Sequence, residues 1–266
     1  MSTARTRIGL HGAMGRMGQR LVQLIAQDPR VELVAAVDRT RLGEDAGAAA
    51  GIGPLGVAVA ALQDLSPTAR PDVVIDFSHP SATLDAVAYC RRNRIPLVVG
   101  TTGLESEPMQ AIEAAAAEIP VLASPNMSRA VNVLMKLVGQ AAAAMGPEAD
   151  VEIVERHHRL KKDAPSGTAL RLAEIVSASS GAGPLVHGRE GQVGARPRGE
   201  IGMHAIRSGD CPGEHTVQFA LGGDTLELTH RALNRDGFVR GAIDAAVFLA
   251  GKPPGSYSMA DVLESP

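Results

Sequence analysis

The sequence predicts an α/β protein of two domains: a Rossmann-like, doubly wound parallel sheet, and a smaller α+β domain with a mostly antiparallel sheet. Three observations predict this fold. Short β-branched runs alternate with helical patterns through the first 125 residues, as in successive βαβ units. A glycine-rich turn stands where the first run meets the first helix. Beyond Met127, segments that alternate with a period of two replace this pattern.

The first domain is expected to contain five strands and at least three helices. The strands are predicted from short apolar runs at Arg7–His11, Val31–Val37, Asp72–Phe77, Ile95–Gly100 and Ile119–Ala123. The first helix is predicted from apolar residues at helical spacing, which are Met17, Leu21, Leu24 and Ile25. Two later helices are indicated by Leu84 with Val87 and by Met109 with Ile112.

The second domain is expected to begin with a long helix over Met127–Met145, followed by a strand that ends at Glu155. A helix over Ser166–Ala178 and a long loop over Gly181–Gly199 come next, because the loop region is rich in Gly, Pro and Arg without apolar periodicity. Three alternating segments follow at Gly202–Arg207, His215–Leu221 and Thr225–His230, and Gly222–Gly223 suits a hairpin turn between the last two. A final helix is predicted over Asp236–Leu249.

Composition narrows the class of protein. The 266 residues suffice for one large domain or two modest ones, and 45% hydrophobic with 21% charged residues is typical of globular proteins. No apolar run is long enough to cross a bilayer, and the first apolar run is too short for a signal peptide. A net charge of −3 and 2% aromatic residues argue against a nucleic-acid partner. Two cysteines form neither a disulfide framework nor a metal motif, so we expect a cytoplasmic protein without a metal.

The glycine turn after the first strand is the cofactor signal. Gly12, Gly15 and Gly18 stand at the strand–helix junction, where a dinucleotide's phosphates would rest on the helix N-terminus. Asp38 ends the second strand, twenty residues beyond Gly18, where an acid meets ribose hydroxyls. Arg39 suits a 2′-phosphate, so both NADH and NADPH are expected as cofactors. The alternative is a generic glycine-rich turn followed by a solvated strand end.

Two further turns follow strands four and five. They are Gly100–Gly103, with the sequence GTTG, and Ser124–Met127, with the sequence SPNM. Ligands of open α/β sheets bind at the carboxyl ends of the strands, so both turns are candidates for cofactor contacts. Because Gly, Thr, Pro and Asn are also common turn residues, ordinary loop structure is an equal alternative.

The stretch Glu155–Thr168 is the catalytic signal. It contains four lysines or arginines and two histidines against two acids, so it would attract an anionic substrate. The sequence Pro-Ser-Gly-Thr then opens a helix, whose free N–H groups, with the hydroxyls of Ser166 and Thr168, would hold a carboxylate. The alternative is a solvated basic loop in which Ser166 only caps the helix.

Four strings together resemble one known family. They are GxxGRMG at Gly12–Gly18, GTTG at Gly100–Gly103, PNxS at Pro125–Ser128 and ExHHRxKxDAPSGTA at Glu155–Ala169. The chain resembles dihydrodipicolinate reductase over its whole length, including RxGDxxGEHT at Arg207–Thr216. The resemblance implies NAD(P)H-dependent reduction of 4-hydroxy-tetrahydrodipicolinate in the diaminopimelate route to lysine. It also implies a dicarboxylate substrate, a homotetramer, a dinucleotide-binding domain of residues 1–127 and 238–266, and a substrate-binding and oligomerisation domain of residues 128–237.

The resemblance also implies roles for individual residues. His157 and Lys161 match the proposed proton donors. His158, Ser166, Gly167 and Thr168 match the substrate-carboxylate contacts. The cofactor contacts are matched by Gly12, Ala13, Met14, Gly15, Arg16, Met17, Asp38, Arg39, Gly100, Thr101, Thr102, Ser124, Pro125, Asn126 and Met127. Met127 replaces a Phe of many members, and Asp38 a Glu of some, which affects nicotinamide packing and cofactor preference rather than the reaction.

Two other classes of protein fit part of these signals. A semialdehyde or aldehyde-phosphate dehydrogenase would need an activated cysteine, but Cys90 lies in a helical pattern and Cys211 in a Gly/Pro turn without an obvious base. An NAD(H)-sensing module without activity would need the glycine turn but neither His157 nor Lys161. The presence of both residues favours the reductase.

Overall fold

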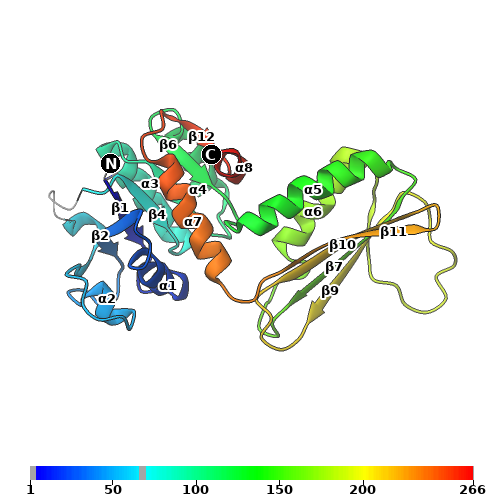
Figure 1. Ribbon diagram of the computed structural model, residues 1–266, viewed down its shortest axis with the longest axis horizontal. Coiled ribbons are helices and arrows are strands. Elements are labelled where there is room, and N and C mark those ends of the chain that lie inside the picture. Colours follow the sequence, from blue (N-terminus) through cyan, green and yellow to red (C-terminus); the bar gives the residue numbers. More distant parts are fainter. Residues whose placement is uncertain (1–3, 66–69, 266) are drawn as a thin grey trace. The chain divides into compact units, whose positions relative to one another are not determined.

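The chain divides into two units, which are Met1–Arg129 with Asp236–Pro266, and Ala130–Arg235. The computed structural model describes residues 4–65 and 70–265 (Figure 1). Unit 1 thus combines the N-terminal half of the chain with the C-terminal segment. Within the described residues, no helix is long and apolar enough to cross a membrane.

Unit 1 is built on a seven-stranded sheet in which every ladder is parallel. Its strands are β1 (Thr6–His11), β2 (Val31–Val37), β3 (Val59–Ala60), β4 (Val73–Asp76), β5 (Leu97–Val99), β6 (Pro120–Ala123) and β12 (Gly255–Tyr257). They lie in the order β3-β2-β1-β4-β5-β6-β12. This is the dinucleotide-fold order, extended by one strand, and its switch point for ligands lies between β1 and β4.

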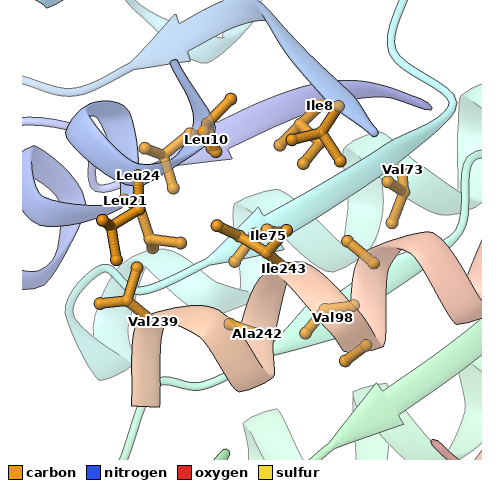
Figure 2. Close-up of a cluster of buried hydrophobic side chains, with 14 of the residues drawn as sticks. Ile8, Leu10, Leu21, Leu24, Val73, Ile75, Val98, Val239, Ala242 and Ile243 are labelled. Atoms are coloured by element: carbon orange, nitrogen blue, oxygen red, sulfur yellow. The ribbon is translucent and has the colours of Figure 1, made fainter. Parts of the chain in front are cut away.

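Helices cover both faces of this sheet. On one face α7 (Asp236–Leu249) packs on β1, β4 and β5, and α1 (Arg16–Ile25) packs on β2 and α7; Leu21, Val239 and Ile243 belong to the apolar cluster that they bury (Figure 2). On the other face α3 (Pro80–Asn93) and α4 (Ser106–Ala115) bury a second apolar cluster. Alternate residues of β4 belong to the two clusters, as the period of a strand requires. The remaining elements are α2 (Ala46–Ala49), the 3-10 turn η1 (Leu62–Asp64) and α8 (Met259–Glu264).

Unit 2 has a five-stranded mixed sheet in the order β11-β10-β7-β9-β8. Its elements are α5 (Arg129–Met145), β7 (Asp150–His157), α6 (Gly167–Ser180), β8 (Leu185–His187), β9 (Ile201–Arg207), β10 (Glu214–Leu221) and β11 (Asp224–Arg231). The ladders of β10 with β11 and with β7 are antiparallel and together hold more residue pairs than the two parallel ladders of β9. Most of the paired residues are therefore antiparallel, as predicted.

The helix-covered face of this second sheet is apolar along most of its length and polar at one end. Val151 and Ile153 of β7 point into the core formed with α5 and α6. The strand alternates inward and outward, so Glu155 and His157 follow on the same buried face. Two titratable groups are thus placed at the end of the core, beside the start of α6.

The expected elements are largely confirmed. Val31–Val37 and Asp236–Leu249 are a strand and a helix with the predicted ends, and Gly222 and Gly223 form a two-residue hairpin turn with φ of 63° and 94°. The long helix begins at Arg129 rather than Met127. The prediction of an unbroken loop over Gly181–Gly199 is wrong, because β8 lies within it, and β3, β12, α2 and α8 were not predicted. Strands of two or three residues at sheet edges carry too little periodicity to be read from sequence.

Candidate active site

The glycine turn between β1 and α1 is tightly packed at two of its three glycines. Gly12 has a φ of +84°, and a Cβ there would lie 2.5 Å from the Phe77 carbonyl oxygen. A Cβ at Gly18 would collide with the carbonyl oxygen of Gly12, which explains why helix and strand can approach so closely. A Cβ at Gly15, by contrast, would meet nothing nearer than that oxygen at 3.4 Å. Fold geometry does not require glycine at position 15, and the space beside its backbone suits a bound group.

Asp38, the residue directly after β2, is bound to the same turn. Its Oδ2 accepts a 2.9 Å hydrogen bond from the Met14 N–H, and its Oδ1 accepts from the N–H groups of Arg39 and Thr40 and from the Thr40 hydroxyl. Burial raises the pKa of this carboxyl, but the hydrogen bonds lower it further and leave the pKa below its usual range. The charged carboxylate therefore orders the glycine turn as well as facing the space next to it.

A pocket of about 320 Å³ opens beside this turn. Five of the predicted cofactor residues line it, and they are Gly12, Met14, Gly15, Asp38 and Arg39. Sequence reasoning did not identify the other side chains that line it, which are His11, Thr40, Phe77, Ser78, His79 and Ala82. These residues end β1 and lie beyond β2 and β4, so the pocket occupies the sheet edge where open α/β folds bind ligands.

The other predicted cofactor residues are not among those that line this pocket. Arg16 and Met17 begin α1, with Arg16 exposed, whereas Ala13 is buried. The turn at Gly100–Thr102 follows β5, and the Thr101 hydroxyl bonds to the buried Asp76 carboxylate at 2.9 Å. In the turn after β6, the Ser124 hydroxyl donates to the Asn126 carbonyl oxygen and Pro125 stands between them. Met127 is buried in the apolar core, so its side chain is part of the packing.

In unit 2 the buried Glu155 joins the predicted catalytic residues. Its Oε2 lies 2.6 Å from His157 Nδ1, and its Oε1 accepts a 3.0 Å hydrogen bond from the Ser166 N–H. The Arg207 guanidinium donates to both oxygens at 2.8 Å. Burial raises the pKa of Glu155, but hydrogen bonds from Arg207 and His157 lower it below its usual range. An ionised Glu155 fixes Nδ1 of His157 as the protonated nitrogen, so Nε2 remains for chemistry.

Beyond this carboxylate, the rings of His157, His215 and His230 contact one another in sequence. The rings of His157 and His215 lie edge to face, with centroids 5.2 Å apart, and His215 stacks on His230 at 6.3 Å. Burial lowers the pKa of His157, and Glu155 raises it by less, so the imidazole is neutral near pH 7. Burial, together with the charges of His157 and His230, lowers the pKa of His215 to about 3. Inside the protein, Glu155 is therefore an ionised carboxylate and His157 beside it is a neutral imidazole.

The start of α6 lies next to this pair. Ser166 is buried, caps the helix through the Ala169 N–H and lies 3.1 Å from His215 Nε2. Gly167 is exposed and Thr168 half-buried, so the accessible part of the helix start is formed by these two residues. Capping by Ser166 is therefore confirmed, and an anion would reach Gly167 and Thr168 more readily.

Two predicted residues lie in the loop between β7 and α6. Lys161 Nζ is 2.9 Å from the Asp163 carboxylate. The His158 N–H donates to the Cys211 carbonyl oxygen, and His158 Nδ1 is buried without a partner in the described structure. The loop thus carries one paired cation and one histidine whose ring nitrogen is not satisfied within the protein.

Glu155, Arg207 and His215 are the functional neighbours that sequence reasoning left without a role. A signal existed, because Glu155 and His157 are two positions apart on one strand and must share a face. The register of the sheet pairs His157 with Arg207 and Glu155 with His215. Spacing along the chain does not reveal that pairing, since it depends on which strands become neighbours.

Comparison with known proteins agrees with this geometry. Residues 6–127 match the family model described as dihydrodipicolinate reductase, N-terminus, and residues 130–263 match its C-terminus. The chain belongs to the dihydrodipicolinate reductase family. It is 51% identical over 257 residues to 4-hydroxy-tetrahydrodipicolinate reductase of Anaeromyxobacter sp. (strain Fw109-5), covering 95% of each chain, and 49% identical to that of Alkalilimnicola ehrlichii, covering 97% of this chain and 98% of the relative.

A solved structure is similar over nearly the same length. Dipicolinate-bound dihydrodipicolinate reductase from Paenisporosarcina sp. TG-14 is 28% identical with a TM-score of 0.76, covering 96% of this chain and 98% of the other. Membership of this family makes the chain an oxidoreductase. The cysteine-dependent alternative loses support from the structure as well, because Cys90 is fully buried and burial raises its pKa.

Proposed function

We propose that the chain reduces 4-hydroxy-tetrahydrodipicolinate to tetrahydrodipicolinate with NADH or NADPH, the 4-hydroxyl group leaving as water, in the diaminopimelate route to lysine. The observation that carries the proposal is the buried Glu155, which holds His157 in one tautomer at the start of α6. The basic loop between β7 and α6 and the exposed start of α6 lie beside the His157 imidazole. This arrangement suits a reaction on a small dicarboxylate. The family relationship supports the same reaction.

The cofactor would be held by unit 1. The open space beside Gly15 and the pocket lined by Gly12, Asp38 and Arg39 fit a dinucleotide diphosphate and ribose. When bound, the nicotinamide cofactor supplies the hydride. Arg39 is exposed and meets Asp85 only at 3.3 Å, so its guanidinium can turn toward a 2′-phosphate. The turns at Gly100–Thr102 and Ser124–Met127 would complete the site at the same sheet edge.

The dicarboxylate would be held by unit 2. The N–H groups at Gly167 and Thr168 and the dipole of α6 favour one carboxylate. His158 and the basic run around Lys161 would hold the other. The related reductase from Paenisporosarcina sp. TG-14 was solved with dipicolinate bound, which supports a ring with two carboxylates as the ligand class.

His157 and Lys161 would manage charge and protons on the substrate. His157 is neutral in the protein alone, and an adjacent dianion favours the protonated form, with Glu155 stabilising the imidazolium. Its Nε2 then donates a proton as negative charge develops on the ring. Lys161 would have to leave Asp163 to place its ammonium against the substrate. The two residues would act together as acid and electrostatic stabiliser.

The test is an assay of NADH and NADPH oxidation with the freshly made condensation product of pyruvate and aspartate semialdehyde. His157→Gln and Lys161→Ala should each lower kcat by about 10²–10⁴-fold with little change in the dissociation constant of NADH. A wild-type chain without activity on this substrate would contradict the proposal. Cofactor binding without any reduction would instead favour a sensing module.

Assembly and location are part of the same proposal. The face of the second sheet that α5 and α6 do not cover carries half-exposed residues such as Val154 and His204, together with the exposed Ile206, and pairing of such faces would build a homotetramer. Light scattering should give four times the 27.6 kDa chain mass, and a stable monomer would contradict this. A cytoplasmic location is supported by Cys90 and Cys211, which are both unpaired, and cell fractionation tests it.

A further inference from the structure

His11 has no role in the proposed function so far, yet it lies at the floor of the cofactor pocket. It is the last residue of β1, directly before Gly12, and its side chain is 8% exposed. His11 pairs in register with Asp76 of β4, and its Nδ1 lies 2.9 Å from the Asp76 carboxylate. Two strands that flank the topological switch point therefore place a histidine–carboxylate pair under the pocket.

Asp76 is committed to this arrangement. It is completely buried and accepts hydrogen bonds from the hydroxyls of Thr83 at 2.8 Å and Thr101 at 2.9 Å, and from the Ser78 N–H at 3.2 Å. Burial raises the pKa of Asp76, but the hydrogen bonds, that from His11 foremost, lower it below its usual range. The ionised Asp76 accepts from His11 Nδ1–H, so the ring nitrogen left to face the pocket is Nε2. That nitrogen has no partner among the residues that the structure describes.

We infer that His11 is a cofactor-binding residue whose Nε2 contacts the diphosphate of the nicotinamide dinucleotide and takes up a proton when the cofactor binds. The inference rests on the proposed cofactor and adds a residue to its site. A glycine turn at a helix N-terminus receives the diphosphate, and His11 is the residue that precedes this turn. An arriving anion favours the protonated imidazole, and Asp76 behind the ring stabilises the charge.

The other charged and titratable groups near His11 do not offer this response. Asp38 already accepts four hydrogen bonds from the protein, and Arg39 is a permanent cation at the exposed rim. His79 Nδ1 accepts from the Ser81 N–H as the cap of α3, so this nitrogen is already occupied within the protein. Cys90 on α3, close to Asp76, stays protonated because burial raises its pKa. His11 is thus the imidazole of the pocket that has a buried carboxylate behind it.

Calorimetry with two ligands tests the inference. NADH and ADP-ribose, which carries the diphosphate without nicotinamide, are titrated at pH 7.5 in two buffers of different ionisation enthalpy. The main variant is His11→Asn, because asparagine keeps a donor for Asp76 but lacks an atom at the position of Nε2. The matched control is His79→Asn, which changes the other pocket histidine to a residue that is equally suited to capping a helix.

The wild-type chain should take up protons, up to one, with both ligands. His11→Asn should abolish the proton uptake and weaken the binding of both ligands roughly tenfold or more. His79→Asn should keep the proton uptake. Circular dichroism should show that the wild-type chain and both variants are folded. Wild-type affinity and proton uptake in His11→Asn would overturn the inference. Uptake with NADH but not with ADP-ribose would overturn the diphosphate assignment. A wild-type chain that binds neither NADH nor NADPH would instead overturn the proposed function, and the inference with it.

Discussion

Replacing Glu155 by Gln should both destabilise the protein and slow its reaction. Glu155 accepts four hydrogen bonds, from His157, from the Ser166 N–H and twice from Arg207, and it is completely buried. Glutamine keeps the shape but removes the charge and turns an N–H₂ group toward donors. Removing one partner of a buried pair costs about 3–5 kcal/mol. The Arg207 side chain is 19% exposed, and water can replace part of its partner, so we expect a loss near the lower end, about 3 kcal/mol.

The assay is urea-induced unfolding at pH 7.5 followed by circular dichroism, together with kcat measured from NADH oxidation. The kcat of Glu155→Gln should fall by about tenfold to a hundredfold, because His157 loses the group that orients its tautomer and stabilises its charge. The pH dependence has a definite sign. The lowered folded-state pKa of Glu155 contributes stability above the usual pKa of 4.5, and this is lost as the pH falls through the folded-state value. The difference between the two chains should therefore shrink in acid.

Glu152→Gln is the matched control. Glu152 lies three residues earlier on the same strand and, like Glu155, contacts a histidine and arginine side chains, here His204, Arg189 and Arg196. Burial raises the pKa of Glu152, but hydrogen bonds also stabilise its charged form and lower the pKa to about 2. Glu152 lies outside the candidate active site. The control should lose stability and keep its kcat. If both variants lost the same fraction of kcat, or if Glu155→Gln kept its kcat, the role assigned to Glu155 would be refuted.

Four further predictions concern the cofactor turn, the substrate anchors and His215. Gly15→Ala should weaken NADH binding without changing the free energy of unfolding. Gly18→Ala should lower the melting temperature, because its Cβ would meet the Gly12 carbonyl oxygen. Equal melting temperatures for the two variants would contradict this prediction. Arg39→Ala should weaken the binding of NADPH, measured by calorimetry, about tenfold more than the binding of NADH. Equal losses of affinity for the two cofactors would show that Arg39 does not contact the 2′-phosphate. Pyridine-2,6-dicarboxylate should inhibit more strongly than pyridine-2-carboxylate, and Thr168→Val should reduce the difference between the two inhibition constants. Equal inhibition constants in the wild-type chain would refute binding of both carboxylates. The folded-state pKa of His215 is about 3, so the unfolded state binds more protons between pH 6.5 and 3 and the unfolding free energy falls as the pH falls. His215→Gln should flatten that slope by up to about 1.4 kcal/mol per pH unit, and an unchanged slope in urea titrations would show that His215 is not responsible.

The predictable part of the fold is the part with local causes. The alternation of short apolar runs with amphipathic stretches specifies βαβ units, and right-handed crossovers then leave few possible sheet orders. Gly222–Gly223 specifies its hairpin because two positive φ angles favour glycine. The short strands β3, β8 and β12 were missed because edge strands of two or three residues are held by hydrogen bonds to a neighbour rather than by their own pattern.

The sequence by itself determined the chemistry that is present: a glycine turn followed by an acid, and a histidine–lysine run before a capped helix. Only the tertiary structure decided how those groups are tuned. Glu155 meets Arg207 across fifty-two residues, and His11 meets Asp76 across sixty-five, because sheet register joins distant strands. Burial then sets the protonation of each pair, since a carboxylate removed from water stays charged only when several donors converge on it. Protonation in these sites is therefore a property of the assembled sheets, and the spacing of residues along the chain does not contain it.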